Sequence, residues 1–352
     1  MAQFHKLSIK SINRVTDKSV AITFAIPEDL KGIYKFKAGQ YITLKTEING
    51  EDVRRDYSIC SSVNSGDVTV AVKAVENGTF SVYANEKLNV GDILEVAEPN
   101  GRFVFEANNA KTRTIAAFAA GSGITPILSI AKTLLEDEPF SNFILVYGNK
   151  KLAEAMFAED ILTLKAKYGN RFHAHFIYSQ AQEQDALFGR IEKSTVNLIV
   201  KNKYKGVTVD SFYLCGPEAM IHTVKDVLIE NNVKEKNIFF ELFTAPTETE
   251  ALNSTEIGNG QTQLKVIVDD EEFEFEMSQD TSILDAALKQ DVDAPYSCQG
   301  GICSSCIARV TEGEATMRQN NILTDNEVAE GLILTCQAHP TTAKIVVDYD
   351  DV

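Results

Sequence analysis

The stretch Ser297–Cys306, SCQGGICSSC, determines the fold of the last part of the chain, because it holds three of the six cysteines in one short loop. A fourth cysteine follows after a gap of 29 residues, which completes the set Cys298, Cys303, Cys306 and Cys336. This C-x4-C-x2-C spacing with a distant fourth cysteine is the plant-type [2Fe–2S] pattern. Each iron needs two protein ligands besides the bridging sulfides, and the loop glycines let backbone N–H groups approach the sulfurs. The loop therefore predicts a two-iron cluster.

The same four cysteines could instead bind a structural zinc ion, so a zinc-stabilised binding module is the alternative from another functional class. The four-residue first gap is unusual for zinc, and the spacing therefore favours the iron–sulfur cluster. Of the other two cysteines, Cys60 is expected in a core, and Cys215 belongs to a later motif. We expect a cytoplasmic protein, and in that setting cysteines serve a metal or catalytic role more often than a disulfide framework.

The negative charge of the chain is concentrated near its C-terminal end. Gln261–Val352 carries −13 of the total −16, from 18 Asp and Glu residues against 5 Lys and Arg. Such acidity argues against nucleic acid as a partner. The most apolar stretch, Thr114–Leu135, is broken by two glycines and a proline, which argues against a membrane span. We expect the acidic region to dock on a basic surface of a partner protein, although acidity can also serve solubility alone.

The chain shows two different secondary-structure patterns before the cysteine loop. Up to about residue 106, β-rich stretches such as Tyr41–Lys45 and Val68–Lys73 alternate with turn dipeptides, which predicts an antiparallel barrel or sandwich. From Lys111, strand and helix patterns alternate, beginning with the strand Thr114–Ala120, which predicts a parallel sheet with crossover helices. The polar stretch Thr244–Gln263 is typical of a linker. Beyond it we expect the hairpin strands Leu264–Val268 and Glu272–Glu276, a helix Ile283–Gln290 capped by Ser282, and a late strand, Lys344–Val347.

The tetrapeptide Arg55-Asp56-Tyr57-Ser58 offers a cation, an aromatic ring and a hydroxyl within four residues. A flavin nucleotide needs a cation for its pyrophosphate, an aromatic side chain against its ring system and a hydroxyl or amide near the reactive nitrogen. Strand alternation would place Arg55 and Tyr57 on one face. Alone, such a tetrapeptide is more often a solvated strand face. Its position before Asn77–Ser81 and before the α/β region favours a flavin site.

Two further motifs indicate a dinucleotide site. Gly121-Ser122-Gly123-Ile124-Thr125-Pro126 follows a buried strand and opens a helix, whose first N–H groups suit a phosphate. It is not the G-x-G-x-x-G fingerprint, so a purely structural turn is the alternative. Cys215-Gly216-Pro217 ends a later strand, where parallel sheets bind ligands. Cys215 could contact a nicotinamide ring or could be a small core residue.

The ordered set Arg55–Ser58, Gly121–Pro126, Cys215–Pro217 and the cysteine loop resembles the ferredoxin–NADP reductase superfamily with a C-terminal plant-type ferredoxin domain. The resemblance covers essentially the whole chain. It extends to stretches typical of oxygenase reductases, namely Leu145–Lys150, Phe188–Ile191, Glu241–Phe243, Ser282–Leu288 and Leu334–Ala338.

The resemblance implies a six-stranded antiparallel β-barrel that binds FAD (1–108), an α/β domain with a five-stranded parallel sheet that binds NAD(P) (109–243), a linker (244–262) and a β-grasp [2Fe–2S] ferredoxin domain (263–352). By resemblance, Arg55 and Asp56 lie at the FAD, Tyr57 packs on its ring system, and Ser58 lies near its reactive nitrogen. Further implied flavin contacts are Val72, Lys73, Gly78, Thr79, Phe80 and Ser81. Implied nucleotide contacts are Gly121, Ser122, Gly123, Thr125, Pro126, Cys215, Gly216 and Pro217, with Glu241 and Phe243 beside the flavin. Ser58, Tyr57, Cys215 and Glu241 form the implied catalytic group.

The resemblance also implies electron flow from a nicotinamide dinucleotide through FAD and the cluster to an oxygenase. The expected acceptor is a di-iron enzyme that epoxidises the ring of phenylacetyl-CoA, with a Rieske dioxygenase or a different di-iron hydroxylase as the alternative. We expect NADPH rather than NADH, because Lys150, Lys151 and Arg190 are candidate partners for a 2′-phosphate. Gln180 stands where many NADPH-dependent relatives carry arginine, so NADH remains the alternative.

Overall fold

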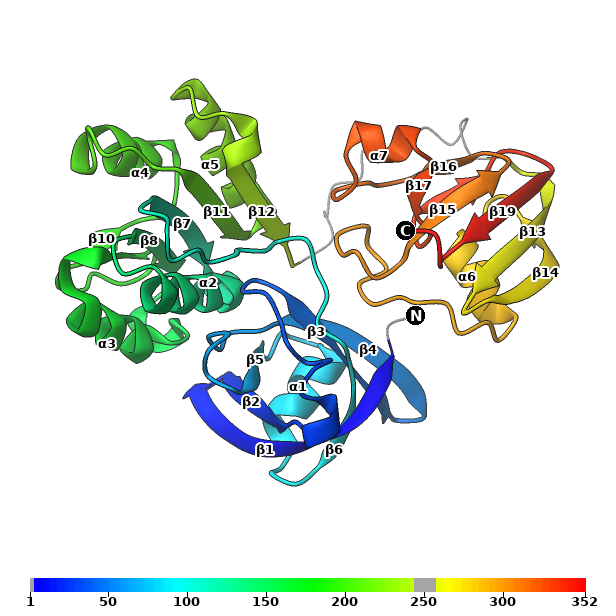
Figure 1. Cartoon of the computed structure of the whole chain (residues 1–352), viewed down its shortest axis with the longest axis horizontal. Helices are drawn as coiled ribbons and strands as arrows, with labels where there is room; N and C mark the ends of the chain where they lie inside the picture. The colour runs from blue at the N-terminus through cyan, green and yellow to red at the C-terminus, as the bar shows by residue number, and fades with distance from the viewer. Residues whose placement is uncertain (1–2, 244–257) are drawn as a thin grey trace. The chain divides into compact units, whose positions relative to one another are not determined.

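The computed structural model describes residues 3–243 and 258–352, which form three domains (Figure 1). Most of the expected linker, residues 244–257, lies outside the described residues, and its last residues already belong to a strand that begins at Gln261. The barrel and the α/β domain share one compact unit, and the C-terminal domain belongs to a second. Within the described residues, no helix is long and apolar enough to cross a membrane.

The first domain is a six-stranded antiparallel barrel with the strand order β4-β3-β6-β1-β2-β5. An isolated antiparallel bridge between Ile59 and Val70 joins the end of β4 to β5. Asn49 and Gly50 both adopt positive φ in the β3–β4 turn, which suits a tight hairpin. The domain contains β1 (Phe4–Thr16), β2 (Ser19–Ala25), η1 (Glu28–Leu30), β3 (Tyr41–Ile48), β4 (Glu51–Ser58), β5 (Val68–Lys73), α1 (Thr79–Glu86) and β6 (Ile93–Ala97).

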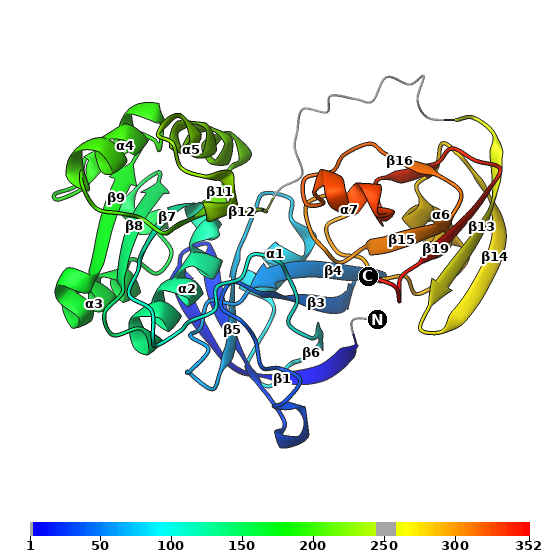
Figure 2. The same ribbon diagram turned by 45° about the horizontal axis from the view of Figure 1, so that its top comes forward.

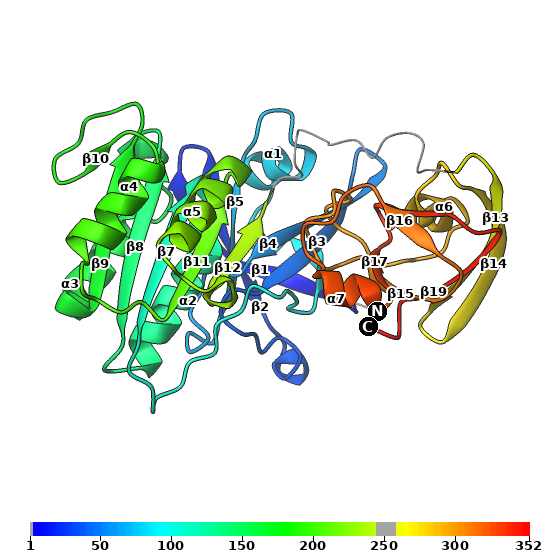
Figure 3. The same ribbon diagram turned by 90° about the horizontal axis from the view of Figure 1, so that it is seen from above.

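The second domain is a parallel sheet with the order β10-β9-β8-β7-β11-β12, which Figure 3 shows as neighbouring strands. The resemblance implied five strands, and the sixth, β10, adds only two residues at the edge beside β9. Helices α2 and α3 cover one face of the sheet and α4 and α5 the other (Figure 1). The elements are β7 (Thr114–Ala120), η2 (Gly121–Gly123), α2 (Ile124–Asp137), β8 (Asn142–Asn149), η3 (Leu152–Glu154), α3 (Ala158–Tyr168), η4 (Gly169–Arg171), β9 (Phe172–Tyr178), β10 (Leu187–Phe188), α4 (Lys193–Asn197), η5 (Leu198–Lys203), β11 (Ser211–Gly216), α5 (Glu218–Glu230), η6 (Glu235–Asn237) and β12 (Ile238–Leu242).

The third domain is a β-grasp fold, in which α6 lies against a mixed sheet of order β14-β13-β19-β15-β17 (Figure 2). The expected hairpin forms between β13 and β14, and the Ser282 hydroxyl caps α6 by accepting the Asp285 N–H at 3.1 Å. A second sheet pairs β16 with β18. The elements are β13 (Gln261–Val268), β14 (Glu271–Ser278), α6 (Ile283–Lys289), β15 (Ile307–Glu312), β16 (Ala315–Met317), α7 (Asp325–Ala329), β17 (Leu332–Leu334), β18 (Ala338–Pro340) and β19 (Lys344–Asp348).

Candidate functional site

The flavin motif lies on β4, and its tyrosine contacts the first turn of α1. Tyr57 is half-buried, and its ring centroid lies 5.5 Å from that of the buried Phe80 in the first turn of α1. Gly78 precedes this helix and no side chain caps it, so the first N–H groups of α1 have no side-chain acceptor there. A Cβ atom at Gly78 would lie 2.3 Å from the Ser81 hydroxyl oxygen, which explains the glycine. Exposed Arg55 on β4 adds a cation. Aromatic ring, helix N-terminus and guanidinium are the groups that suit a flavin nucleotide.

The glycine-rich turn η2 lies between β7 and α2, where the order of the parallel strands reverses. From β7 the chain adds β8, β9 and β10 on one side and β11 and β12 on the other. Ligands of such sheets bind at this switch point, beyond the carboxyl ends of the strands. Gly121 has φ +55, and a Cβ atom at Gly123 would lie 2.1 Å from the Cys215 carbonyl oxygen. Both positions thus require glycine, and the turn presses against the end of β11.

The structure brings the two nucleotide motifs and one flavin residue together. Cys215 on β11 pairs with Ala119 on β7 and with Glu241 on β12. Glu241 in turn accepts a hydrogen bond from the Ser58 hydroxyl of the barrel at 3.1 Å. Burial, and secondarily the charge of Glu241, raises the pKa of the fully buried Cys215 thiol, so it stays protonated at neutral pH. Ser58, Cys215 and Glu241 therefore form one cluster across the two domains.

The remaining predicted nucleotide residues surround this cluster. Thr125 is buried, and its hydroxyl donates to the Ser122 carbonyl at 3.0 Å. Phe243 is half-buried and packs against the hydrophobic cluster that contains Cys215. Cys60 is buried in the same cluster, as expected for a core cysteine.

The four cysteines of the C-terminal domain are arranged as two pairs. The Cys303 thiol donates to Cys298, which also accepts the Gly300 N–H at 3.3 Å. These bonds lower the pKa of Cys298 to about 6. A hydrogen bond from the Cys306 thiol likewise lowers the pKa of Cys336. Two pairs of thiols suit a cluster in which each iron takes two thiolates.

Residues around the cysteines hold the loop and the distant ligand segment together. Thr335, next to Cys336, donates both its N–H and its hydroxyl to the Cys306 carbonyl at 3.1 and 3.0 Å. The buried Tyr349 hydroxyl donates to the Thr335 hydroxyl at 2.9 Å. Gln337, on the other side of Cys336, donates to the Gln299 carbonyl at 3.0 Å. Sequence reasoning missed the roles of these residues, because only the fold brings positions 14 to 38 residues apart into contact.

Within residues 3–243 and 258–352, no three His, Cys, Asp or Glu side chains are arranged to hold a single metal ion. The thiols pair as Cys298 with Cys303 and Cys306 with Cys336, which is the pairing expected when each of two irons takes two thiolates.

The outer edge of the nucleotide sheet gathers residues that could recognise the adenosine half of a dinucleotide. The Gln180 N–H donates to the Lys150 carbonyl at 2.9 Å, and the Gly189 N–H donates to the Tyr178 carbonyl at 2.9 Å. The strand ends that carry Lys150, Gln180 and Arg190 are therefore neighbours. Phe188 on β10 is 64% exposed there, and it was not foreseen as a site residue.

Comparison with known protein families matches each domain. Residues 6–105 match the oxidoreductase FAD-binding domain, residues 118–226 the oxidoreductase NAD-binding domain, and residues 266–341 the 2Fe-2S iron-sulfur cluster binding domain. The protein thus uses FAD, a pyridine nucleotide and a [2Fe–2S] cluster.

Relatives of similar length match over nearly the whole chain. The chain is 39% identical to a subunit of the 1,2-phenylacetyl-CoA epoxidase of Escherichia coli, over 99% of both chains. It is 28% identical to the ferredoxin reductase component of 3-ketosteroid-9-alpha-monooxygenase of Rhodococcus rhodochrous, over 97% of this chain and 96% of that one. Among solved structures, phthalate dioxygenase reductase superposes with a TM-score of 0.62 at 25% identity, covering 98% of each chain. The chain therefore belongs to the family of NAD(P)H-dependent oxidoreductases that join an FAD barrel, a nucleotide domain and a [2Fe–2S] ferredoxin domain, the family of that phenylacetyl-CoA epoxidase component.

Proposed function

We propose that this protein is the reductase component of a phenylacetyl-CoA epoxidase and delivers electrons from NADPH to the di-iron oxygenase component. The observation that carries the proposal is the 39% identity, over 99% of both chains, to a component of the Escherichia coli enzyme of that name. The relatives at 28% identity and below belong to other monooxygenases. An oxygenase of another type is therefore the second candidate acceptor.

The division of roles follows from the chemistry of the site. FAD accepts two electrons together as a hydride and passes them on singly, which suits the one-electron [2Fe–2S] cluster. We propose that the turn Gly121–Gly123 and the first turn of α2 bind the nucleotide pyrophosphate, with Thr125 toward the nicotinamide. On the flavin side, Arg55 and the α1 N-terminus would bind the pyrophosphate, and Tyr57 would pack on the ring system.

Ser58 and Glu241 would then keep the flavin-binding strand and the nucleotide domain in a fixed relative position. Their hydrogen bond joins the flavin-bearing strand β4 to β12 of the nucleotide domain. In the C-terminal domain, Cys298, Cys303, Cys306 and Cys336 would hold the irons, and Thr335 and Gln337 would fix the position of the distant ligand. The boundaries 1–108, 109–243, 244–262 and 263–352 remain our proposed division of the chain.

The preference for NADPH is the part of the proposal that rests on the outer sheet edge. Lys150 and Arg190 are exposed on neighbouring strand ends, where a 2′-phosphate would find two cations. Exposed Phe188 offers a flat surface for an adenine ring.

The acidic C-terminal domain, with its net charge of −13, would dock on a basic surface of the oxygenase. Because four of the six cysteines are assigned to a cluster rather than to disulfides, we propose a cytoplasmic location.

The test is a reconstitution of the full-length holoprotein with candidate oxygenases. NADPH oxidation and substrate conversion are followed together, with phenylacetyl-CoA and its di-iron oxygenase in one series and a Rieske dioxygenase with its own substrate in the other. We expect NADPH oxidation to match product formation only in the first series, and the coupling to weaken with added salt because the docking is electrostatic. Coupling to the Rieske enzyme alone would refute the proposed acceptor.

A further inference from the structure

Helix α2 carries a row of buried hydroxyl side chains along one face. Thr125, Ser129 and Thr133 are spaced four residues apart and are 2%, 0% and 2% exposed. Residues at this spacing lie above one another on a helix. Within the first turn, Thr125 belongs to the proposed nucleotide site, so the row runs from that site along the helix.

The barrel provides the partners of the two later members of this row. The Ser129 hydroxyl donates to the Ser61 carbonyl at 2.7 Å, and the Val63 N–H donates to the Thr133 hydroxyl at 3.4 Å. A buried helical serine commonly bonds to the carbonyl one turn earlier in its own helix, but Ser129 bonds across the domain boundary instead. Ser61 follows Ser58 by three residues. The helix that opens at the nucleotide turn is thus tied to the segment that carries the flavin-side serine.

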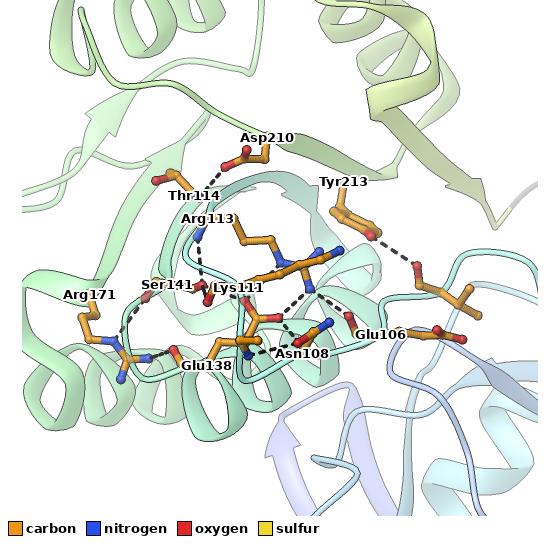
Figure 4. A network of polar contacts seen from close by, with 12 residues as sticks. Glu106, Asn108, Lys111, Arg113, Thr114, Glu138, Ser141, Arg171, Asp210 and Tyr213 are labelled. Carbon is orange, nitrogen blue, oxygen red and sulfur yellow. Dashed lines mark hydrogen bonds and ion pairs between the residues drawn. The ribbon is translucent and has the colours of Figure 1, made fainter.

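The far end of α2 is also bound to the barrel side of the boundary. Asn64 donates to Asp137 at 2.7 Å, and Ser62 donates to Glu136. Glu138, which ends the helix, is buried and accepts the Asn108 N–H at 2.9 Å (Figure 4).

Figure 4 shows that Glu138 also holds Arg113. Arg113 donates to the Glu138 carboxylate through Nε at 3.1 Å and Nη2 at 2.5 Å, and its Nη2 reaches the Glu106 carbonyl at 2.8 Å. The connection from the barrel to β7 runs over residues 106–113, so the middle and the C-terminal end of α2 are fixed relative to the barrel.

We propose that α2 sets the distance between the nicotinamide and the flavin, and that Ser129 is a positioning residue for hydride transfer. This role for Ser129 depends on the nucleotide and flavin contacts proposed above. Hydride transfer tolerates little misplacement, since an error of about 1 Å in a reacting pair can cost about a hundredfold in rate. Loosening the Ser129–Ser61 bond lets the nucleotide turn and Thr125 shift together relative to Ser58, without removing any group that touches either cofactor.

The first test compares Ser129→Ala with Tyr34→Phe in the holoprotein. Tyr34 is a matched control, because its buried hydroxyl also donates to a carbonyl, that of Val96 at 2.6 Å, but within the barrel. Anaerobic stopped-flow mixing with NADPH gives the limiting rate of flavin bleaching and the half-saturating NADPH concentration. For Ser129→Ala we expect the limiting rate to fall about five- to tenfold, the effect of one lost hydrogen bond, with half-saturation within about twofold. Tyr34→Phe should change neither.

The second test does not depend on turnover. Hydrogen exchange of the segment 59–66, measured in the holoprotein and after removal of FAD, should be faster in Ser129→Ala than in the wild type or in Tyr34→Phe. An unchanged limiting rate in Ser129→Ala, or a loss confined to half-saturation or to FAD content, would overturn the proposal. A wild type that reduces its flavin with NADPH but does not support the epoxidase would refute the proposed acceptor and leave this inference standing.

Discussion

The hydrogen bond from Ser58 to Glu241 allows a quantitative prediction about flavin reduction. Ser58 is 5% exposed, and its hydroxyl donates to a carboxylate at 3.1 Å. A hydrogen bond to a charged group is worth about 1.5–3 kcal/mol. Since about 1.4 kcal/mol corresponds to a factor of ten in rate, Ser58→Ala should slow flavin reduction by about ten- to a hundredfold.

The measurement is anaerobic stopped-flow reduction of the flavin at saturating NADPH. A double-mutant cycle with Glu241→Gln separates the bond from other effects of each side chain. If the two residues act through their mutual bond, the double variant should be no slower than the slower single variant. Independent losses that multiply in the double variant, or a Ser58→Ala rate equal to the wild type, would contradict this reasoning.

Three further predictions concern the cluster, the domain boundary and the nucleotide. Cys336→Ser should abolish the electron output that depends on the cluster, measured as electron transfer to the oxygenase, while NADPH still reduces the flavin, as absorbance spectra would record. Loss of flavin reduction as well would show that the modules depend on each other. Glu138→Gln should lower the free energy of unfolding by about 3–5 kcal/mol at neutral pH, because it leaves Arg113 without its buried partner. Burial would raise the pKa of Glu138, but hydrogen bonds from Arg113, Ser141 and Asn108 outweigh burial and lower that pKa. The loss of unfolding free energy in Glu138→Gln should therefore be full above about pH 5 and shrink at lower pH, as the wild-type carboxylate becomes protonated. A loss that does not change with pH in denaturant titrations would be inconsistent with this. Arg190→Ala should raise the half-saturating concentration of NADPH several-fold more than that of NADH in steady-state assays, and an equal change for both would remove Arg190 from the phosphate site.

Local patterns in the sequence were sufficient to predict most of the fold. The strand Thr114–Ala120 and the cap at Ser282 appear at the expected residues. Both depend on neighbours in the sequence, the strand on a continuous apolar stretch and the cap on a serine just before a helical pattern. The sixth strand of the nucleotide sheet could not be predicted, since β10 is two residues long and depends on its pairing with β9. The approach of Gly123 to the Cys215 carbonyl explains why two separate motifs belong to one site.

The residues that sequence reasoning missed act through contacts between distant segments. Ser129 and Glu138 look like an ordinary helical serine and a surface acid until the fold places them against Ser61 and Arg113. Thr335 and Gln337 were similarly hidden beside Cys336. Cysteine spacing is informative in the sequence because cluster geometry constrains it directly, whereas a supporting hydrogen bond can come from many residue types.

Electrons from the nucleotide should reach a two-iron cluster held by the four paired cysteines. The most direct measurement is an anaerobic titration of the purified protein with NADPH, followed by electron paramagnetic resonance. Protein that contains about two irons and two acid-labile sulfides per chain should develop the signal of a reduced [2Fe–2S] cluster, and Cys336→Ser should not. Bleaching of the flavin with no such signal in the iron-loaded wild type would contradict the account.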